Sequence, residues 1–167
     1  MSIFKLEVDA DGIAVISWDV PGASMNVMST QGYKELNDLI DKVIADDTIK
    51  GAVITSGKKD FAGGMDLNEL GSIRADAGSV EPAKNVFEAT MQAHRLLRKI
   101  ERAGMEPKTN AGGKPIVAAL PGTAAGIGIE LALSTHRVFV SDRKGAKYGL
   151  PECLVGIFPG GGGTIRM

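Results

Sequence analysis

Gly122-Thr123-Ala124-Ala125-Gly126-Ile127-Gly128-Ile129-Glu130 is the stretch that decides the fold class. The apolar run Ile116 to Leu120 predicts a buried strand before it, and Glu130 to Ser134 predicts a helix after it. A glycine-rich turn between strand and helix leaves backbone N–H groups free to hold a phosphate or an oxyanion. Because the Glu130 carboxylate would repel a phosphate, the pattern favours acid–base chemistry beside a polarised carbonyl.

Two further glycine-bounded segments carry the same kind of chemistry. Pro151 stiffens the backbone directly before Glu152, so we expect this second carboxylate to be aimed by its backbone and to converge with Glu130 on one pocket. Residues 61–67, Phe-Ala-Gly-Gly-Met-Asp-Leu, follow the strand predicted over 51–55 and supply another turn with N–H donors.

These segments resemble the crotonase (enoyl-CoA hydratase/isomerase) superfamily. The matching motifs are Gly63 to Leu67, Gly122 to Glu130 and Pro151 to Thr164, in the order found in that family. Residues 19–27 look like the version in multifunctional fatty-acid oxidation proteins of the alpha-subunit type, where a hydratase domain precedes a 3-hydroxyacyl-CoA dehydrogenase. The resemblance covers nearly the whole chain and implies an α/β fold, the crotonase-like ββα-repeat spiral.

The resemblance also assigns roles in binding an acyl-CoA thioester. The backbone N–H groups of Met65 and Ile127 would form an oxyanion hole, and Glu130 and Glu152 would be the catalytic pair that handles the water. The residues expected to contact substrate or coenzyme A are Asn26, Ala62, Gly64, Met65, Asp66, Leu67 and Gly126. No metal or cofactor is expected, since coenzyme A is part of the substrate.

The function implied is hydration of 2-enoyl-CoA thioesters in fatty-acid β-oxidation. An enoyl-CoA isomerase and a non-catalytic fragment of a multifunctional dehydrogenase/hydratase remain alternatives. A dinucleotide-binding module fits poorly, because Leu131 stands where its third glycine would be. The chain departs from the family in having Ile127 where glycine is frequent, and in a longer connection over 142–145, which we expect to be a surface insertion.

Composition sets the remaining limits. The chain has 167 residues and a net charge of −1, which fits one domain without a general attraction to nucleic acid. Its single cysteine, Cys153, excludes an internal disulfide, fits a reducing compartment and is expected to be buried. No apolar stretch has the ~20 residues needed to span a bilayer, and the N-terminus lacks the apolar core of a signal peptide. We therefore expect a cytoplasmic protein.

Residues 1–167 are expected to be the N-terminal part of a crotonase-like hydratase domain, truncated at the C-terminus, because the glycines over 160–163 lead into what reads as a new helix. In the full-length protein we expect a homo-oligomer or a complex with a thiolase subunit. Other expected elements are a hairpin around Asp11-Gly12, a helix from Ser29 or Thr30 to about Asp46, a short helix near Leu67 to Leu70, a polar connection over 71–82, a helix over 83–102 and a strand over 137–141.

Overall fold

The computed structural model describes residues 2–69 and 80–167, apart from some side chains at the start of the second range. The strands are β1 (Phe4–Val8), β2 (Ile13–Trp18), β3 (Gly51–Ser56), β4 (Ile116–Leu120), β5 (Ala124–Ala125), β6 (Arg137–Val140) and β7 (Tyr148–Gly149). The helices are α1 (Thr30–Ala45), α3 (Val80–Arg102), α4 (Ile127–Leu133), the 3₁₀ helix η1 (Glu152–Val155) and α5 (Gly163–Arg166). A further short helix starts at Leu67, as expected, and its expected end at Leu70 lies outside the described residues.

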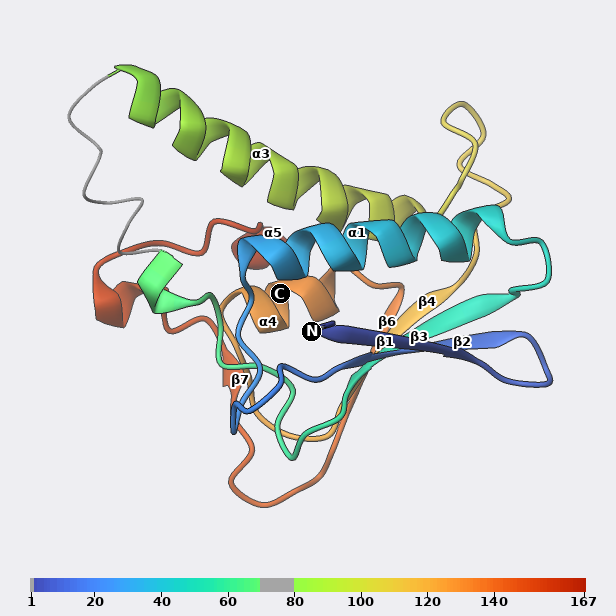
Figure 1. Ribbon diagram of the computed structural model, residues 1–167, viewed down its shortest axis with the longest axis horizontal. Coiled ribbons are helices and arrows are strands. Elements are labelled where there is room, and N and C mark those ends of the chain that lie inside the picture. Colours follow the sequence, from blue (N-terminus) through green and yellow to red (C-terminus); the bar gives the residue numbers. More distant parts are fainter. Residues whose placement is uncertain (1, 70–79) are drawn as a thin grey trace.

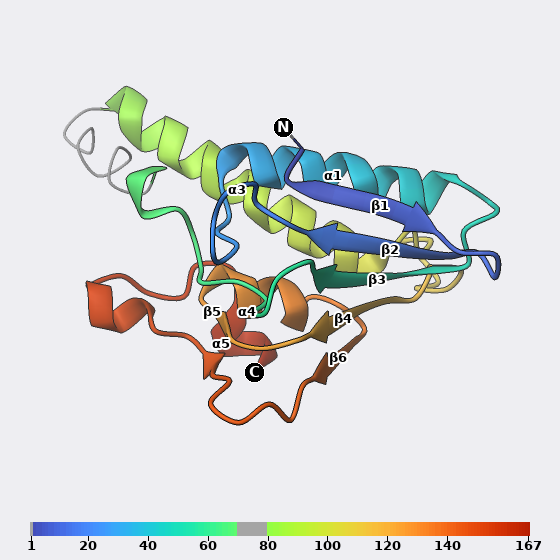
Figure 2. The same ribbon diagram turned by 60° about the horizontal axis from the view of Figure 1, so that its bottom comes forward.

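The main sheet has the strand order β1-β2-β3-β4-β6. β1 and β2 form the expected antiparallel hairpin, whereas β2, β3, β4 and β6 run parallel. The parallel strands are joined by connections that contain α1, α3 and α4, and Figures 1 and 2 show α1 and α3 side by side over one face of the sheet. This alternation of strands and helices is the α/β arrangement that the sequence predicts.

Helix α1 forms because its ends are capped and one face is apolar. The Ser29 hydroxyl accepts the Gly32 N–H at 3.1 Å, which satisfies a free donor of the first turn. Leu36, Ile40 and Val43 recur at helical spacing and are fully buried in the core. The helix predicted from the sequence is thus confirmed at both ends.

A second, smaller ladder lies at the carboxyl ends of the parallel strands. Residues 26–28 pair with 63–66, because the Met28 N–H donates to the Gly64 carbonyl and the Asp66 N–H donates to the Met28 carbonyl, each at 2.8 Å. Residue 62 pairs with 124, and β5 pairs with β7. This ladder brings the first two motif segments together and places the third just after β7.

Two helix starts differ from the sequence prediction. α4 begins at Ile127, not at Glu130, so Glu130 lies in its first turn. α3 begins at Val80, not at Ala83, and Pro82 fits in the first turn because no intrahelical N–H bond is required there. The polar connection expected up to Pro82 is therefore shorter, and most of it lies outside the described residues.

Candidate active site

Glu130 is a buried carboxylate held by the glycine-rich segment 160–163. It is 2% exposed, and its Oε1 accepts the Gly163 N–H at 2.9 Å. A Cβ atom on Gly161 would lie 2.6 Å from Glu130 Oε2, and one on Gly163 would lie 2.9 Å from Glu130 Cγ. Glycine is therefore needed at both positions because the backbone packs directly on this side chain.

Glu152 is the second buried carboxyl group. It is 8% exposed and is the first residue of η1, directly after Pro151. This agrees with the expectation that the backbone before Glu152 is stiff. Burial raises the pKa of Glu152, and the negative charge of Glu130 raises it further. Its Oε2 is buried without a hydrogen-bond partner in the described part of the chain. The two carboxyl groups therefore interact electrostatically in a shared, poorly solvated region.

The 160–163 segment is fixed from behind by an ion pair that the sequence did not reveal. Arg166 donates from its Nη1 to the Gly161 carbonyl at 2.5 Å, and its Nε lies 2.5 Å from Glu101 Oε1 on α3. Both side chains are about four-fifths buried, with exposures of 20% and 21%. Because this pair joins residues 65 positions apart, no local pattern in the sequence could have found it.

The candidate oxyanion donors each follow a glycine with a positive φ angle. Gly64 has φ +115° and Gly126 has φ +55°, conformations that favour glycine. A Cβ on Gly126 would lie 3.5 Å from Gly64 Cα and 3.3 Å from Glu152 Oε1, so the two turns adjoin each other and the carboxyl group. Neither the Met65 N–H nor the Ile127 N–H donates to a protein acceptor within the described ranges.

The other residues expected to contact substrate lie around these turns. Ala62 is buried against Ala124, and the Gly126 N–H is engaged by the Gly149 carbonyl at 3.1 Å. Asp66 accepts the Asn68 N–H at 2.8 Å, which gives it a helix-start role. The Leu67 side chain is 68% exposed, so it is available to a ligand.

Asn26, which was expected to contact substrate or coenzyme A, lies in the connection between β2 and α1. Its side chain is completely buried and makes hydrogen bonds only within the protein. The amide is thus enclosed by its own chain, and its role in the structure is to hold neighbouring segments together.

The expectation of a buried cysteine is wrong. Cys153 is exposed, because η1 turns Glu152 inward and leaves the next side chain at the surface. The connection over 142–145 lies at the surface as expected: Asp142, Lys144 and Gly145 are exposed, and Arg143 is half-buried in an ion pair with Asp60. Lys58 forms an ion pair with Asp19 at 2.7 Å.

Comparisons with known proteins agree with the motifs. The family model described as enoyl-CoA hydratase/isomerase matches residues 9–167. The fatty acid oxidation complex subunit alpha of Shewanella frigidimarina is 36% identical over 165 residues, which are 98% of this chain and 21% of that protein. The corresponding subunit of Shewanella halifaxensis is 35% identical over the same length. The chain thus spans about a fifth of the length of these relatives.

Solved structures give the same fold. The crystal structure of an enoyl-CoA hydratase from Geobacillus kaustophilus is 29% identical, with a TM-score of 0.81, over 99% of this chain and 55% of that one. An enoyl-CoA hydratase from Shewanella pealeana has a TM-score of 0.79 over 95% of this chain and 53% of that one, at 16% identity, and so supports the fold alone. The expected crotonase-type α/β fold is confirmed. On its motifs, its fold and the matched family model, this chain belongs to the enoyl-CoA hydratase/isomerase family.

Proposed function

We propose that the protein hydrates 2-enoyl-CoA thioesters, as the hydratase part of a fatty-acid oxidation protein. One observation carries the proposal: two buried, electrostatically interacting carboxyl groups adjoin two neighbouring glycine turns. Among the described residues, the Met65 and Ile127 N–H groups that follow these turns have no protein acceptor. Hydration of a conjugated thioester needs a polarised carbonyl, a base for water and an acid for C2. The name of the relatives, fatty acid oxidation complex subunit alpha, supports a reaction of fatty-acid oxidation.

In the proposed mechanism, the thioester carbonyl accepts hydrogen bonds from the Met65 and Ile127 N–H groups. Glu130 takes a proton from water as its oxygen adds to C3, and the electrons of the double bond move onto the carbonyl oxygen as an enolate. Glu152 then donates its proton to C2, which restores the carbonyl. A donor of this kind typically contributes ~2.7–4 kcal/mol to transition-state stabilisation.

The division of roles follows from the surroundings of each group. Glu130 accepts the Gly163 N–H, which suits a carboxylate that acts as base. The raised pKa of Glu152, caused by burial and by the Glu130 charge, favours the protonated acid. The proposed chemistry uses only these side chains and the backbone, without a metal or organic cofactor.

Steady-state hydration of crotonyl-CoA by the protein at its full natural length tests the proposal. Glu130→Gln and Glu152→Gln are each expected to lower kcat by at least ~10²-fold while keeping acyl-CoA binding. Glu7→Gln, which changes an exposed glutamate on β1, is the matched control and should leave turnover unchanged. A Glu130 or Glu152 variant with normal turnover would remove that residue from the mechanism. Conversion of a 3-enoyl-CoA to a 2-enoyl-CoA without hydration would instead establish the isomerase alternative.

Within the described residues, no helix combines the length and apolar character needed to cross a membrane. We propose that the protein acts in the cytoplasm on acyl-CoA thioesters, as a homo-oligomer or with a thiolase subunit. Light scattering of the purified protein, alone and after co-expression with such a subunit, tests the assembly.

A further inference from the structure

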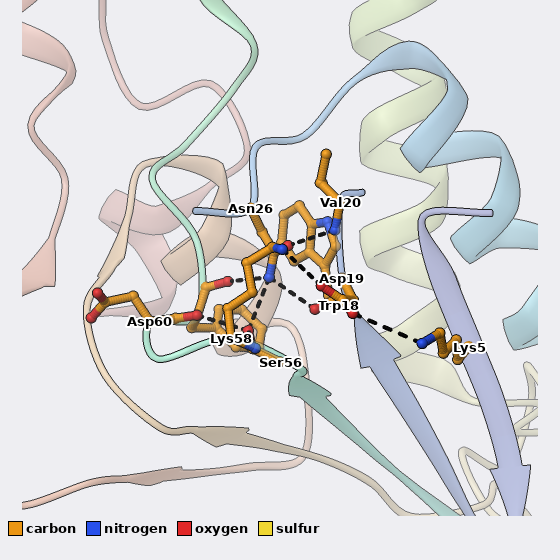
Figure 3. Close-up of polar contacts among 9 residues, drawn as sticks. Lys5, Trp18, Asp19, Val20, Asn26, Ser56, Lys58 and Asp60 are labelled. Carbon is orange, nitrogen blue, oxygen red and sulfur yellow. Dashed lines mark hydrogen bonds and ion pairs between the residues drawn. The ribbon is translucent and has the colours of Figure 1, made fainter. Parts of the chain in front are cut away.

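Asn26 is a fully buried amide in the connection between β2 and α1, and all of its polar atoms are used. Figure 3 shows the hydrogen bonds that converge on it. Its Nδ2 donates to Ser56 Oγ and the Trp18 carbonyl at 2.9 Å and to the Phe61 carbonyl at 3.0 Å. Its Oδ1 accepts the Val20 N–H at 2.9 Å. One side chain therefore joins the end of β2, the end of β3 and the turn that follows β3.

That turn leads directly to the Met65 N–H. Ser56 closes it, because its hydroxyl donates to the Asp60 carbonyl at 2.7 Å and accepts the Lys58 N–H at 3.0 Å. The turn then continues through Phe61, whose carbonyl is held by Asn26. The side chains of Asn26 and Ser56 thus fix the turn at its start and at its end.

The backbone of Asn26 fixes the segment beyond the turn. Its carbonyl accepts the Gly63 N–H at 2.8 Å. Two residues later, Met28 bonds to the Gly64 carbonyl and to the Asp66 N–H. In such a parallel pairing the groups of alternate residues face opposite sides, so the Met65 N–H faces away from Met28. That is the orientation a donor to a ligand requires.

We propose that Asn26 is a positioning residue that sets the direction of the Met65 N–H toward the thioester carbonyl, and that it never contacts the substrate. This inference rests on the proposed function, since it concerns the same carbonyl. Asparagine is required because the site needs one acceptor and at least two donors in one planar group. Aspartate has the same shape but offers no donor to the Trp18 and Phe61 carbonyls, which would then lie buried against a carboxyl group.

The test is the carbonyl stretching frequency of butyryl-CoA, labelled with ¹³C at the thioester carbonyl, bound to the full-length protein. This probe has no double bond to hydrate, and a hydrogen-bonded carbonyl absorbs at lower frequency than a free one. Asn26→Asp is expected to lose most of the shift and to lower kcat for crotonyl-CoA by ~10²-fold, as a misplacement of about 1 Å does. The dissociation constant of butyryl-CoA should change less than about twofold, because contacts with the remainder of the ligand are unchanged.

Ser56→Ala is the milder variant, because it removes only the hydroxyl that links Asn26 to the turn. It is expected to lose part of the shift and several-fold in kcat. Thr55→Val is the matched control on the same strand, since it removes a single hydrogen bond to the Ala119 carbonyl without touching Asn26 or the turn. This control should keep the full shift and normal turnover.

The outcomes separate the inference from the proposed function. No shift in the unmodified protein would refute the oxyanion hole itself. A shift in the unmodified protein that is fully retained in Ser56→Ala, and in any folded Asn26→Asp protein, would refute the positioning role. If Asn26→Asp does not fold, Ser56→Ala against Thr55→Val decides.

Discussion

Gly161→Ala probes the contact between the glycine segment and the Glu130 carboxylate. The added Cβ would lie 2.6 Å from Glu130 Oε2 and 2.8 Å from its Cδ, about 0.8 Å inside the 3.4 Å at which ordinary contact begins. Gly161 is not among the glycines with positive φ, so alanine fits its backbone and only the space changes. The added Cβ would also lie 3.0 Å from Ile127 Cδ1, so its closest contacts are with the Glu130 carboxyl group and a milder one is with Ile127.

The structure indicates which partner moves. The Gly161 carbonyl is held by Arg166, which is itself held by Glu101, so the loop is fixed from behind. The carboxylate is the end of a flexible side chain and moves instead, which stretches its bond to the Gly163 N–H. A displacement approaching 1 Å costs on the order of 10²-fold in rate for a positioned catalytic group. Overpacking adds about 1–3 kcal/mol of destabilisation.

The assay is crotonyl-CoA hydration at 25 °C, with thermal unfolding measured in parallel. We expect kcat to fall by ~10²-fold and the midpoint of unfolding to fall by about 2–10 °C, so the variant stays folded in the assay. Gly160→Ala is the matched control, since its Cβ would meet only the Phe158 carbonyl at 4.0 Å, and it should keep normal turnover. Normal turnover in Gly161→Ala as well would refute the role given to Glu130.

Three further predictions concern stability. The raised pKa of Glu152 means that the folded state binds its proton more tightly than the unfolded state, so this group lowers stability as pH rises from its ordinary pKa of 4.5 through the raised value. Glu152→Gln should therefore gain stability relative to the parent as pH rises above 4.5 in thermal unfolding. Parallel curves for the two proteins would contradict this. For Glu101, burial raises the pKa, but the hydrogen bonds and charges of Arg166 and Arg98 lower it more. Its contribution to folding stability is therefore present above pH 4.5 and is lost as pH falls. Glu101→Gln should be less stable than the parent at pH 7 and equally stable in acid, and a stability difference that does not change with pH would count against the ion pair. Ser29→Ala should lose about 1 kcal/mol in urea unfolding, because the Gly32 N–H loses its cap, and an unchanged midpoint would show that the cap contributes nothing.

Local patterns in the sequence were enough to predict several elements. The alternation of β1 and β2 around Gly12 specifies a hairpin, and Gly12 indeed has a positive φ of +83°. The serine cap and apolar stripe of α1 specify its start and its buried face. These signals work because each depends on residues close together in the chain.

The start of α4 could not be predicted in the same way. Glycine is a poor helix former, so Gly126 and Gly128 indicated a turn up to Glu130. In the structure Gly128 lies inside α4, which packs closely on the 61–67 segment. Glycine is required there because a Cβ would lie 2.7 Å from the Ala62 Cβ. Tertiary packing overrides the local preference at this position.

In the candidate site, too, features that depend on local motifs could be predicted and features that depend on long-range contacts could not. Three ordered motifs predicted Glu130, Glu152 and the two N–H donors, and their catalytic roles stay predictions. The hydrogen bond from the Gly163 N–H to the Glu130 carboxylate joins residues 33 positions apart in the sequence. The hydrogen bonds of the Asn26 amide come from three separate segments. Such long-range contacts leave no local signal in the sequence.

A crystal structure of the full-length protein with bound butyryl-CoA tests the central claim most directly. We predict that the thioester oxygen lies about 2.7–3.1 Å from both the Met65 and Ile127 nitrogens, with the Glu130 and Glu152 carboxyl groups facing C2 and C3. A thioester oxygen bound elsewhere, or either N–H turned to a protein acceptor in the complex, would contradict the account.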